Sequence, residues 1–197
     1  MADPASQFRP AVPADADALA DLVDMASDGL ASYLWSKVAP PGCDPWVIGR
    51  ARATREPGGI SYRNAVVVER AGRVVAGMIG HPLADTPEAW PPRLPAMVVP
   101  LQELEDQVPG TWSVNVLAAY PEHRGKGYGT ALLGVAELLA RATHRRGLSI
   151  IVADTNVGAR RLYERCGFRI VAERRMVKEA WQHPGTSFVL MCRRLAG

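Results

Sequence analysis

The segment from Trp112 to Thr130 carries the residues whose types and spacing first suggest chemistry. Residues 112–119 alternate between apolar and mixed side chains, which predicts a strand, and Pro121 ends that strand. The chain then reads Arg-Gly-Lys-Gly-Tyr-Gly from Arg124 to Gly129 and continues into a helical pattern. Glycines let the main chain approach a ligand closely, and the first amides of a helix have no acceptor within it. We therefore expect a phosphate-binding turn here, with Arg124 and Lys126 adding positive charge.

Two common phosphate-binding motifs do not fit this spacing. A P-loop needs Ser or Thr after its Gly-Lys pair, whereas the chain continues here with Gly127 and Tyr128. A dinucleotide-binding fingerprint needs its third glycine at position 130, which is Thr130. On this stretch alone, a nucleotide-binding protein and a tight turn whose glycines serve only the backbone both stay open.

A second segment, residues 154–168, reads Asp-Thr-Asn-Val-Gly-Ala-Arg-Arg-Leu-Tyr-Glu-Arg-Cys-Gly-Phe. Thr155 or Asn156 caps a predicted helix whose apolar stripe includes Tyr163, and Gly167 ends that helix. The helix predicted after the glycine-rich turn covers residues 128–146, and the apolar run at 148–153 is typical of a central strand. Strand, helix and strand make a predicted parallel βαβ unit.

Together the two segments resemble the GNAT superfamily of acyl-CoA-dependent N-acetyltransferases. The family's acyl-CoA signature, Arg/Gln-x-x-Gly-x-Gly/Ala, matches at Arg124, Gly127 and Gly129. Its Asn-x-x-Ala-x-x-Leu-Tyr-x-x-x-Gly-Phe segment is complete between Asn156 and Phe168. The resemblance implies a single domain over residues 1–197 with an α/β (α+β) fold. That fold is a mixed, mostly antiparallel sheet of six to seven strands, with helices on both faces and a splayed parallel pair formed by the fourth and fifth strands.

The resemblance also implies acetyl-CoA as co-substrate, a primary amine as acceptor, and direct attack in a ternary complex. It places the pantetheine arm along the backbone of Leu117 and Ala119 and against Asn156, and it makes Tyr163 the group that hydrogen-bonds the departing sulfur. The residues that it assigns to the pyrophosphate are Arg124, Gly125, Lys126, Gly127, Tyr128, Gly129 and Thr130.

Proton transfer is the step for which the sequence provides fewest groups. A phenol has a pKa near 10 and a thiol one near 8.5, so complete proton transfer from Tyr163 to the departing thiolate costs about 2 kcal/mol. This cost is small enough for Tyr163 to assist the leaving sulfur. A lysine-like amine costs about 4.6 kcal/mol to deprotonate at pH 7, which makes a base necessary. Many family members carry a glutamate on the fourth strand, whereas this strand offers Ser113 and Asn115. We expect deprotonation through water held by Asn115, or by a carboxylate from residues 28–46 or 84–110.

Residues 84–110 form a proline-rich insert between the third and fourth predicted strands. It contains one short helical pattern, in which Leu101, Leu104 and Val108 share a face, and we expect a pocket wall or a dimer contact. Its acidic residues at 103, 105 and 106 fit a solvated helix face, with selection of a cationic acceptor as the alternative. Elsewhere the aromatic residues Tyr33, Trp35 and Trp46 are candidate substrate contacts or ordinary packing residues.

The remaining elements follow from hydrophobic periodicity and turn residues. An edge strand is predicted at 8–12, and Asp15 is expected to cap a helix at 16–27. Further elements are two short helices at 30–37 and 45–54, a hairpin of strands 65–70 and 73–80 around Ala71-Gly72, and strands at 168–177 and 186–195.

Composition narrows the function classes. The 197 residues carry a net charge of +3 without a long basic run, so we expect no nucleic-acid partner. No apolar run reaches the roughly 18 residues of a membrane span, so no membrane partner is expected. The three cysteines are distant from one another, which favours a cytoplasmic location and no metal site. A homodimer is possible, a non-catalytic acyl-CoA sensing module is the alternative function, and the identity of the amine stays open.

Overall fold

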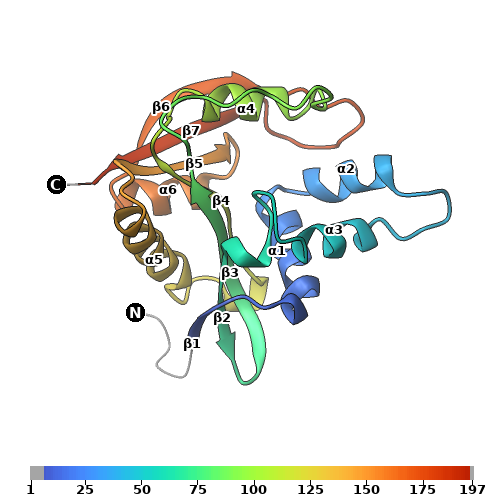
Figure 1. Cartoon of the computed structure of the whole chain (residues 1–197), viewed down its shortest axis with the longest axis horizontal. Coiled ribbons are helices and arrows are strands. Elements are labelled where there is room, and N and C mark those ends of the chain that lie inside the picture. Colours follow the sequence, from blue (N-terminus) through green and yellow to red (C-terminus); the bar gives the residue numbers. More distant parts are fainter. Residues whose placement is uncertain (1–6, 196–197) are drawn as a thin grey trace. The chain divides into compact units, whose positions relative to one another are not determined.

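The computed structural model describes residues 7–195, and within them the strands are ordered β1-β2-β3-β4-β5-β7-β6 (Figure 1). The strands are β1 (Gln7–Pro10), β2 (Ala65–Arg70), β3 (Arg73–Pro82), β4 (Trp112–Ala119), β5 (Gly147–Ala153), β6 (Arg169–Arg175) and β7 (Ser187–Arg194). The helices are α1 (Ala16–Ala26), α2 (Leu30–Val38), α3 (Trp46–Ala53), α4 (Val99–Glu105), α5 (Tyr128–Ala142) and α6 (Val157–Arg165).

Strand pairing confirms the predicted mixed, mostly antiparallel sheet. The pairs β1–β2, β2–β3, β5–β7 and β6–β7 are antiparallel. β4 and β5 are parallel, with Trp112 opposite Leu148 and Val114 opposite Ile150. Because α5 lies between these two strands in the chain, the predicted βαβ unit is also confirmed.

The described chain divides into two compact units, which we treat separately. The first unit comprises residues 7–80 and 115–132, and the second comprises residues 81–114 and 133–195. The boundaries between the units fall within β3, β4 and α5. A single domain over the whole chain stays a prediction.

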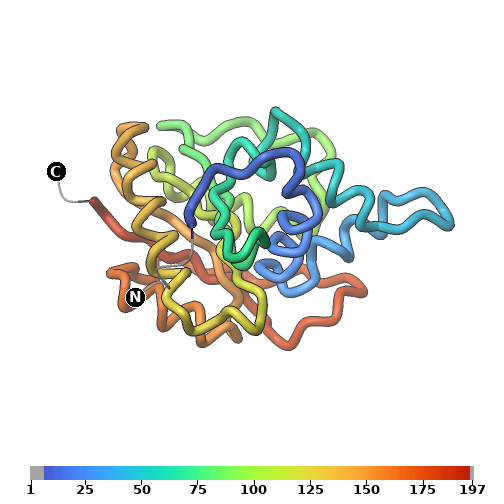
Figure 2. Tube along the Cα trace, turned by 90° about the horizontal axis from the view of Figure 1, so that it is seen from below, coloured from blue at the N-terminus to red at the C-terminus, as the bar shows by residue number. Residues whose placement is uncertain are grey.

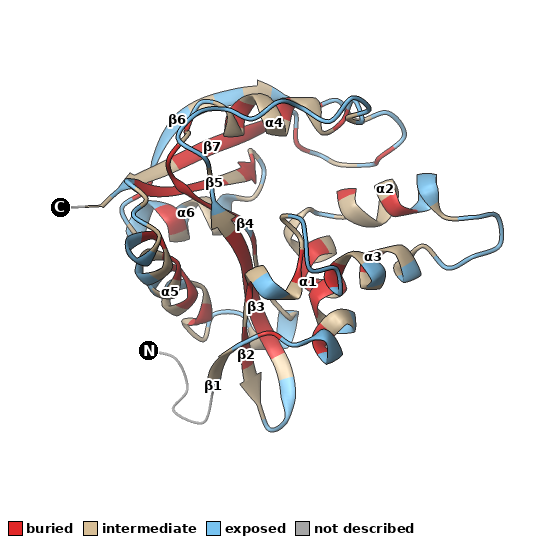
Figure 3. Cartoon of the chain, in the orientation of Figure 1, coloured by how far each residue is buried: buried red, intermediate tan, exposed pale blue. Residues whose placement is uncertain are grey.

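The sheet of the first unit is built on a tight hairpin. Ala71 and Gly72, between β2 and β3, have φ of 49° and 72°, the left-handed pair that a type I′ turn requires. The core of this unit forms where α1 packs on the strands: Leu19 and Leu22 of α1 are fully buried together with Val67 of β2 (Figure 3). The predicted hairpin and the predicted amphipathic helix are therefore both present.

Helices α2 and α3 run beside each other, and the turn that joins them extends beyond their ends (Figure 2). Trp35 of α2 is only 2% exposed, and its ring meets that of Trp46 edge-on, with centroids 5.3 Å apart. A Cβ on Gly49 of α3 would lie only 2.6 Å from the nearest atoms of the Trp35 ring, so the ring packs against α3 at this glycine. Of the two roles considered for Trp35, that of a packing residue is confirmed, and Trp46 packs against it. Contact between Tyr33 and substrate stays a prediction.

Asp15 does not act as the expected side-chain cap of α1. Its carboxylate instead accepts hydrogen bonds from the backbone N–H of Val12 at 2.8 Å and from the Arg9 guanidinium at 2.7 and 2.9 Å. Arg9 also donates from Nε to Glu69 on β2 at 2.7 Å. Asp15 therefore fastens β1 to the turn before α1, because a guanidinium competes more strongly for a carboxylate than a backbone amide does.

In the second unit β7 pairs on one side with β5 and on the other with β6. β5 is buried along nearly its whole length, as its apolar sequence predicts. Helix α4, the one helix of the 84–110 insert, packs on β6 and β7 (Figure 1). Pro100 and Leu104 of α4 are buried, and Glu103 of the same helix pairs with Arg174 of β6.

Candidate active site

The glycine-rich turn lies in the first unit and has the conformation that its sequence predicts. Gly125 and Gly127 have φ of 72° and 84°, a region that side-chain-bearing residues rarely adopt. Helix α5 starts at Tyr128, and the backbone N–H of Ala131 donates to the carbonyl of Gly127 at 3.1 Å. The amides of the first helical turn therefore have no acceptor inside the helix and can bind an anion.

Side chains of this turn join it to the end of β4. Arg124 donates from Nε to the carbonyl of Ala119 at 3.2 Å, which leaves its terminal N–H groups to face an anion. Lys126 Nζ lies 3.4 Å from Nδ1 of His123. Tyr128 is only 2% exposed, so its ring is packed within the protein. The structure thus brings Ala119, Arg124 and the glycines into one compact turn.

The other two predicted acyl-CoA residues lie on α6 in the second unit. Asn156, rather than Thr155, caps the helix: its Oδ1 accepts a hydrogen bond of 3.1 Å from the N–H of Ala159. The cap uses the side-chain oxygen and leaves the NH₂ group for another acceptor. Tyr163 is 5% exposed, and its ring lies 5.9 Å from that of Phe168, so packing holds the phenol in one orientation.

The part of β4 that belongs to the second unit has an acidic neighbour. Ser113 is buried, and its hydroxyl donates to Oε1 of Glu105 at 3.0 Å. Asn115, further along β4, is exposed. The strand itself contains no carboxylate, as the sequence shows, but α4 brings one to it. The sequence left water held by Asn115 and a carboxylate from residues 28–46 or 84–110 open as routes for deprotonation, and Glu105 is a residue of the second segment that contacts β4.

The three acidic residues at 103, 105 and 106 are partly exposed, and each has a hydrogen-bond or ion-pair partner. Glu103 pairs with Arg174 of β6 at 2.9 Å. Glu105 bonds Ser113, and Asp106 accepts hydrogen bonds from Nε1 of Trp90 at 2.7 Å and from Gln102 at 3.0 Å. The helix face that the sequence predicted to be solvated is therefore covered in part.

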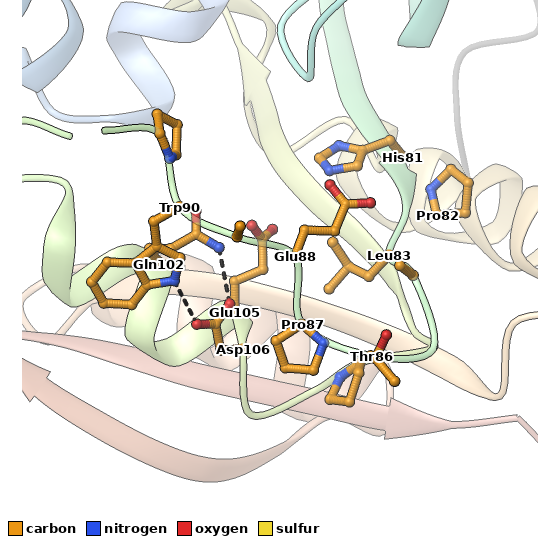
Figure 4. A pocket seen from close by; sticks show the side chains of 14 residues that line it. His81, Pro82, Leu83, Thr86, Pro87, Glu88, Trp90, Gln102, Glu105 and Asp106 are labelled. Atoms are coloured by element: carbon orange, nitrogen blue, oxygen red, sulfur yellow. Dashed lines mark hydrogen bonds between the residues drawn. The ribbon is translucent and has the colours of Figure 1, made fainter. Parts of the chain in front are cut away.

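A cavity of about 300 Å³ lies in the second unit between the end of β3, the insert and α4 (Figure 4). Its polar lining residues include His81, Glu88, Gln102, Glu105 and Asp106. Nδ1 of His81 is buried and has no hydrogen-bond partner among the described residues. Of the two roles expected for the insert, the cavity supports that of a pocket wall.

Two searches of residues 7–195 gave negative results. No group of three or more His, Cys, Asp or Glu side chains is arranged to hold a metal ion. No helix among these residues is both long enough and apolar enough to cross a membrane.

Comparison with known proteins defines the class of protein. The model of the Acetyltransferase (GNAT) family matches residues 37–168, about two thirds of the sequence. The chain therefore belongs to the GNAT family of acetyltransferases, whose reaction is acyl-CoA-dependent acetyl transfer. The family resemblance seen in the sequence is confirmed. A comparison with curated proteins found no match.

Solved structures share the fold at low sequence identity. An acetyltransferase aligns with a TM-score of 0.67 and 20% identity over 96% of this chain and 100% of its own. A GNAT family acetyltransferase from Elizabethkingia anophelis, solved with acetyl-CoA bound, gives 0.59 and 14% over 98% and 100%. The ribosomal-protein-alanine N-acetyltransferase from Brucella melitensis gives 0.56 and 21% over 96% and 99%. These likenesses confirm the predicted fold class.

Proposed function

We propose that this chain transfers the acetyl group of acetyl-CoA to the nitrogen of a primary amine, by direct attack in a ternary complex. The observation that carries the proposal is the turn before α5, in which two left-handed glycines lead into a 15-residue helix. Such a turn offers several main-chain amides and the positive end of a helix dipole to a pyrophosphate. Membership of the GNAT family supports acetyl-CoA as the molecule that carries it.

The role of Asn115 as a holder of water stays a prediction, and the other predicted residues have the following roles in this proposal. The amides from Gly125 to Thr130 bind the pyrophosphate, and the side chains of Arg124 and Lys126 add charge. The backbone of Leu117 and Ala119 on β4 accepts the pantetheine arm, as the family resemblance implies. The side-chain NH₂ of Asn156 donates to one of its amide carbonyls while Oδ1 keeps α6 capped.

The chemical step begins with loss of a proton from the ammonium form of the acceptor. The neutral nitrogen attacks the thioester carbon, a C–N bond forms, and the C–S bond breaks. Tyr163 gives its phenolic proton to the leaving thiolate. After the C–N bond has formed, the nitrogen loses its second proton, and this proton restores the phenol of Tyr163. The products are the N-acetylamine, the CoA thiol and one proton released to solvent.

A non-catalytic acyl-CoA sensor is the second candidate, because β4 carries no carboxylate. The contact between Glu105 and Ser113 argues against it, since α4 supplies the missing group beside the strand. A nucleotide-binding protein is a third reading of the turn. That reading predicts that ATP or NAD raises the melting temperature, whereas the proposed function predicts this for CoA alone.

The proposed function is tested with acetyl-CoA and a panel of small amines, amino acids and peptides with free N-termini or lysines. Release of the CoA thiol is followed continuously, and the N-acetylated product is identified by mass spectrometry. Turnover above the amine-free rate with at least one amine is expected. CoA binding without turnover on any amine would favour the sensor. Propionyl-CoA in parallel tests whether the acyl site accepts groups larger than acetyl.

A cytoplasmic location and a homodimer are the remaining expectations from the sequence, and both stay proposals. Light scattering of the purified chain tests the homodimer. Fractionation of cells that express the chain tests the location.

A further inference from the structure

The cavity beside α4 has an unusual balance of charge. Three carboxylate residues, Glu88, Glu105 and Asp106, line it, and its lining contains neither lysine nor arginine. Arg145 and Arg146 bond to the main-chain carbonyls of the lining residues Leu83 and Pro109, and Arg145 also pairs with Asp85. The lining carboxylates therefore face the cavity without a lysine or arginine among them.

The hydrogen bonds of two of these carboxylates come from uncharged donors. Asp106 accepts from the indole of Trp90 and from the amide of Gln102, and Glu105 accepts from the hydroxyl of Ser113. Neutral donors fix the orientation of a carboxylate but leave its negative charge uncompensated. A cation entering the cavity would supply that compensation.

An aromatic wall adds a second attraction for a cation. Trp90 is 40% exposed although its indole N–H is fastened to Asp106 at 2.7 Å, so part of the ring stays open beside the carboxylates (Figure 4). Ammonium groups are attracted to the faces of indole rings as well as to carboxylates. Ring and carboxylates together favour an organic ammonium ion over a metal ion, for which no coordinating group was found in residues 7–195.

We propose that this cavity is the acceptor site for a cationic primary amine, and that Glu105, held by Ser113, is the base that removes the ammonium proton. The proposal rests on the proposed function and deepens it by naming the acceptor class and the catalytic carboxylate. The position of Glu105 carries the assignment, because it both lines the cavity and bonds to β4, the strand along which the pantetheine arm is expected.

One oxygen of the Glu105 carboxylate takes a proton from R–NH₃⁺ and leaves R–NH₂, whose lone pair then attacks the thioester carbon. The carboxylic acid afterwards releases that proton to solvent, which regenerates the carboxylate. The other groups that bear on this transfer are His81 of β3, Glu88 of the insert and Asp106 of α4, which share the cavity.

The acceptor class follows from the same charges. An amine that also carries a carboxylate brings its own negative charge towards Glu88, Glu105 and Asp106, and the repulsion weakens its binding. Small amines, amino-acid amides and esters fit, whereas free amino acids do not. Because the cavity measures about 300 Å³, a short aryl-alkyl amine can enter it whole, and a longer peptide can present only its end.

A set of four related compounds tests the acceptor class. The set is 2-phenylethylamine, phenylalanine amide, phenylalanine and 2-phenylethanol, which share a ring and differ in charge. We expect the first two to bind in calorimetry and to be acetylated, with kcat/KM at least about tenfold above that of phenylalanine. 2-Phenylethanol should not bind. Equal use of phenylalanine and its amide, or equal binding of the alcohol and the amine, would overturn the assignment.

The base is tested with Glu105→Gln and the matched variant Glu103→Gln, which lies on the same helix but pairs with Arg174 outside the cavity. Glu105→Gln should lower kcat for 2-phenylethylamine by about 100-fold or more. The deficit should shrink between about pH 7 and 9.5, since solvent increasingly supplies the free amine. Glu103→Gln should keep the wild-type rate. A Glu105→Gln deficit that is constant with pH, or absent, would refute the base.

Failure of this inference can be told apart from failure of the proposed function. If the wild-type chain acetylates amines but Glu105→Gln matches it, the acetyltransferase stands and the base assignment falls. If no amine is acetylated, calorimetry with 2-phenylethylamine still tests whether the cavity binds an organic cation. Loss of this binding in Glu88→Gln and Asp106→Asn would support a cation-binding site in the cavity. Absence of binding in the wild type would refute that site.

Discussion

The hydroxyl of Ser113 on β4 donates a hydrogen bond of 3.0 Å to Oε1 of Glu105 on α4. Ser113 is buried, so this donor is fixed by the strand, and a bond from a fixed donor to a carboxylate sets the direction of the second oxygen. Ser113 is therefore a positioning residue: it acts through Glu105.

We expect Ser113→Ala to lower kcat by about tenfold, the worth of one hydrogen bond to a charged group, and to leave KM for acetyl-CoA unchanged. Ser113→Thr, which keeps the hydroxyl, should recover most of the rate. Ser149→Ala is the control, because Ser149 makes a comparable buried hydrogen bond with Thr111. Equal loss of kcat in both alanine variants would show a structural effect only. Steady-state kinetics with one amine at saturation measures these rates.

A side chain at Gly129 should block the phosphate site. Gly127 is a poor position for this test because its φ of 84° would strain any replacement, whereas Gly129 lies within α5. Gly129→Val should weaken CoA binding at least about tenfold, since the added methyl groups stand beside the first-turn amides. Calorimetry with CoA measures the loss.

Gly134→Val provides the matched change on the same helix. A Cβ on Gly134 would meet no atom within 4 Å, so this variant carries the same cost in helix propensity without approaching the turn. Its CoA affinity should equal that of the wild type. Equal CoA affinities of the wild type, Gly129→Val and Gly134→Val would show that the pyrophosphate does not bind at the start of α5.

Tyr163→Phe removes one hydroxyl while keeping the ring that packs against Phe168. We expect kcat to fall about 10- to 100-fold, with CoA affinity near the wild-type value, because the phenol assists the departure of sulfur. A thioester with a more acidic leaving thiol should narrow the gap between variant and wild type. Unchanged kcat with acetyl-CoA would exclude the assigned role.

The elements that the sequence predicted well are those whose signals are local. The glycine-rich turn, the Ala71-Gly72 hairpin and the Asn156 cap depend on backbone conformations that few residue types allow, so a few letters specify them. The parallel pairing of the fourth and fifth strands followed from the family resemblance.

Predictions that depended on a distant partner were less reliable. Asp15 was expected to cap α1 from its position alone, but Arg9 on β1 takes its carboxylate. For Trp35 the sequence left substrate contact and packing as alternatives, and only the structure shows that Trp46 and α3 cover it. Glu105 gave no local sign that distinguished it from Glu103, because the difference is made by which strand each side chain reaches. Periodicity reports the face of a helix but not the partner of that face.

The ion pair of Arg9 and Asp15 should make stability depend on pH in acid. The pKa of Asp15 lies below its ordinary value of 3.8, chiefly because the Arg9 guanidinium donates to the carboxylate. A lowered pKa in the folded chain adds stability that is complete above the unfolded value and is lost as pH falls through the folded one. The free energy of unfolding should therefore decrease below about pH 4.

Asp15→Asn should remove that pH dependence and should lower the free energy of unfolding at pH 7 by about 2 kcal/mol. Urea denaturation between neutral pH and about pH 3 measures both effects. Glu56→Gln is the control, because the pair of Glu56 with Arg63 is largely exposed and should contribute no measurable stability. A parallel pH dependence in wild type and Asp15→Asn would contradict the assignment.

The cysteines should differ in reactivity. Burial raises the pKa of the Cys192 thiol to about 11, whereas Cys43 is exposed. Because the thiolate is the reactive form, iodoacetamide at pH 8 should label Cys43 well before Cys192. Peptide mass spectrometry over time gives the two rates, and equal rates in the native chain would contradict the burial of Cys192. In urea the rates should converge.

The central claim is that the turn before α5 delivers acetyl-CoA for transfer to an amine. It is tested most directly by mass spectrometry of 2-phenylethylamine incubated with acetyl-CoA and with the wild-type chain, Gly129→Val or Gly134→Val. We expect N-acetyl-2-phenylethylamine to accumulate with the wild type and with Gly134→Val, and to fall at least about tenfold with Gly129→Val. Product formed equally by all three proteins, or by none of them, would contradict the account.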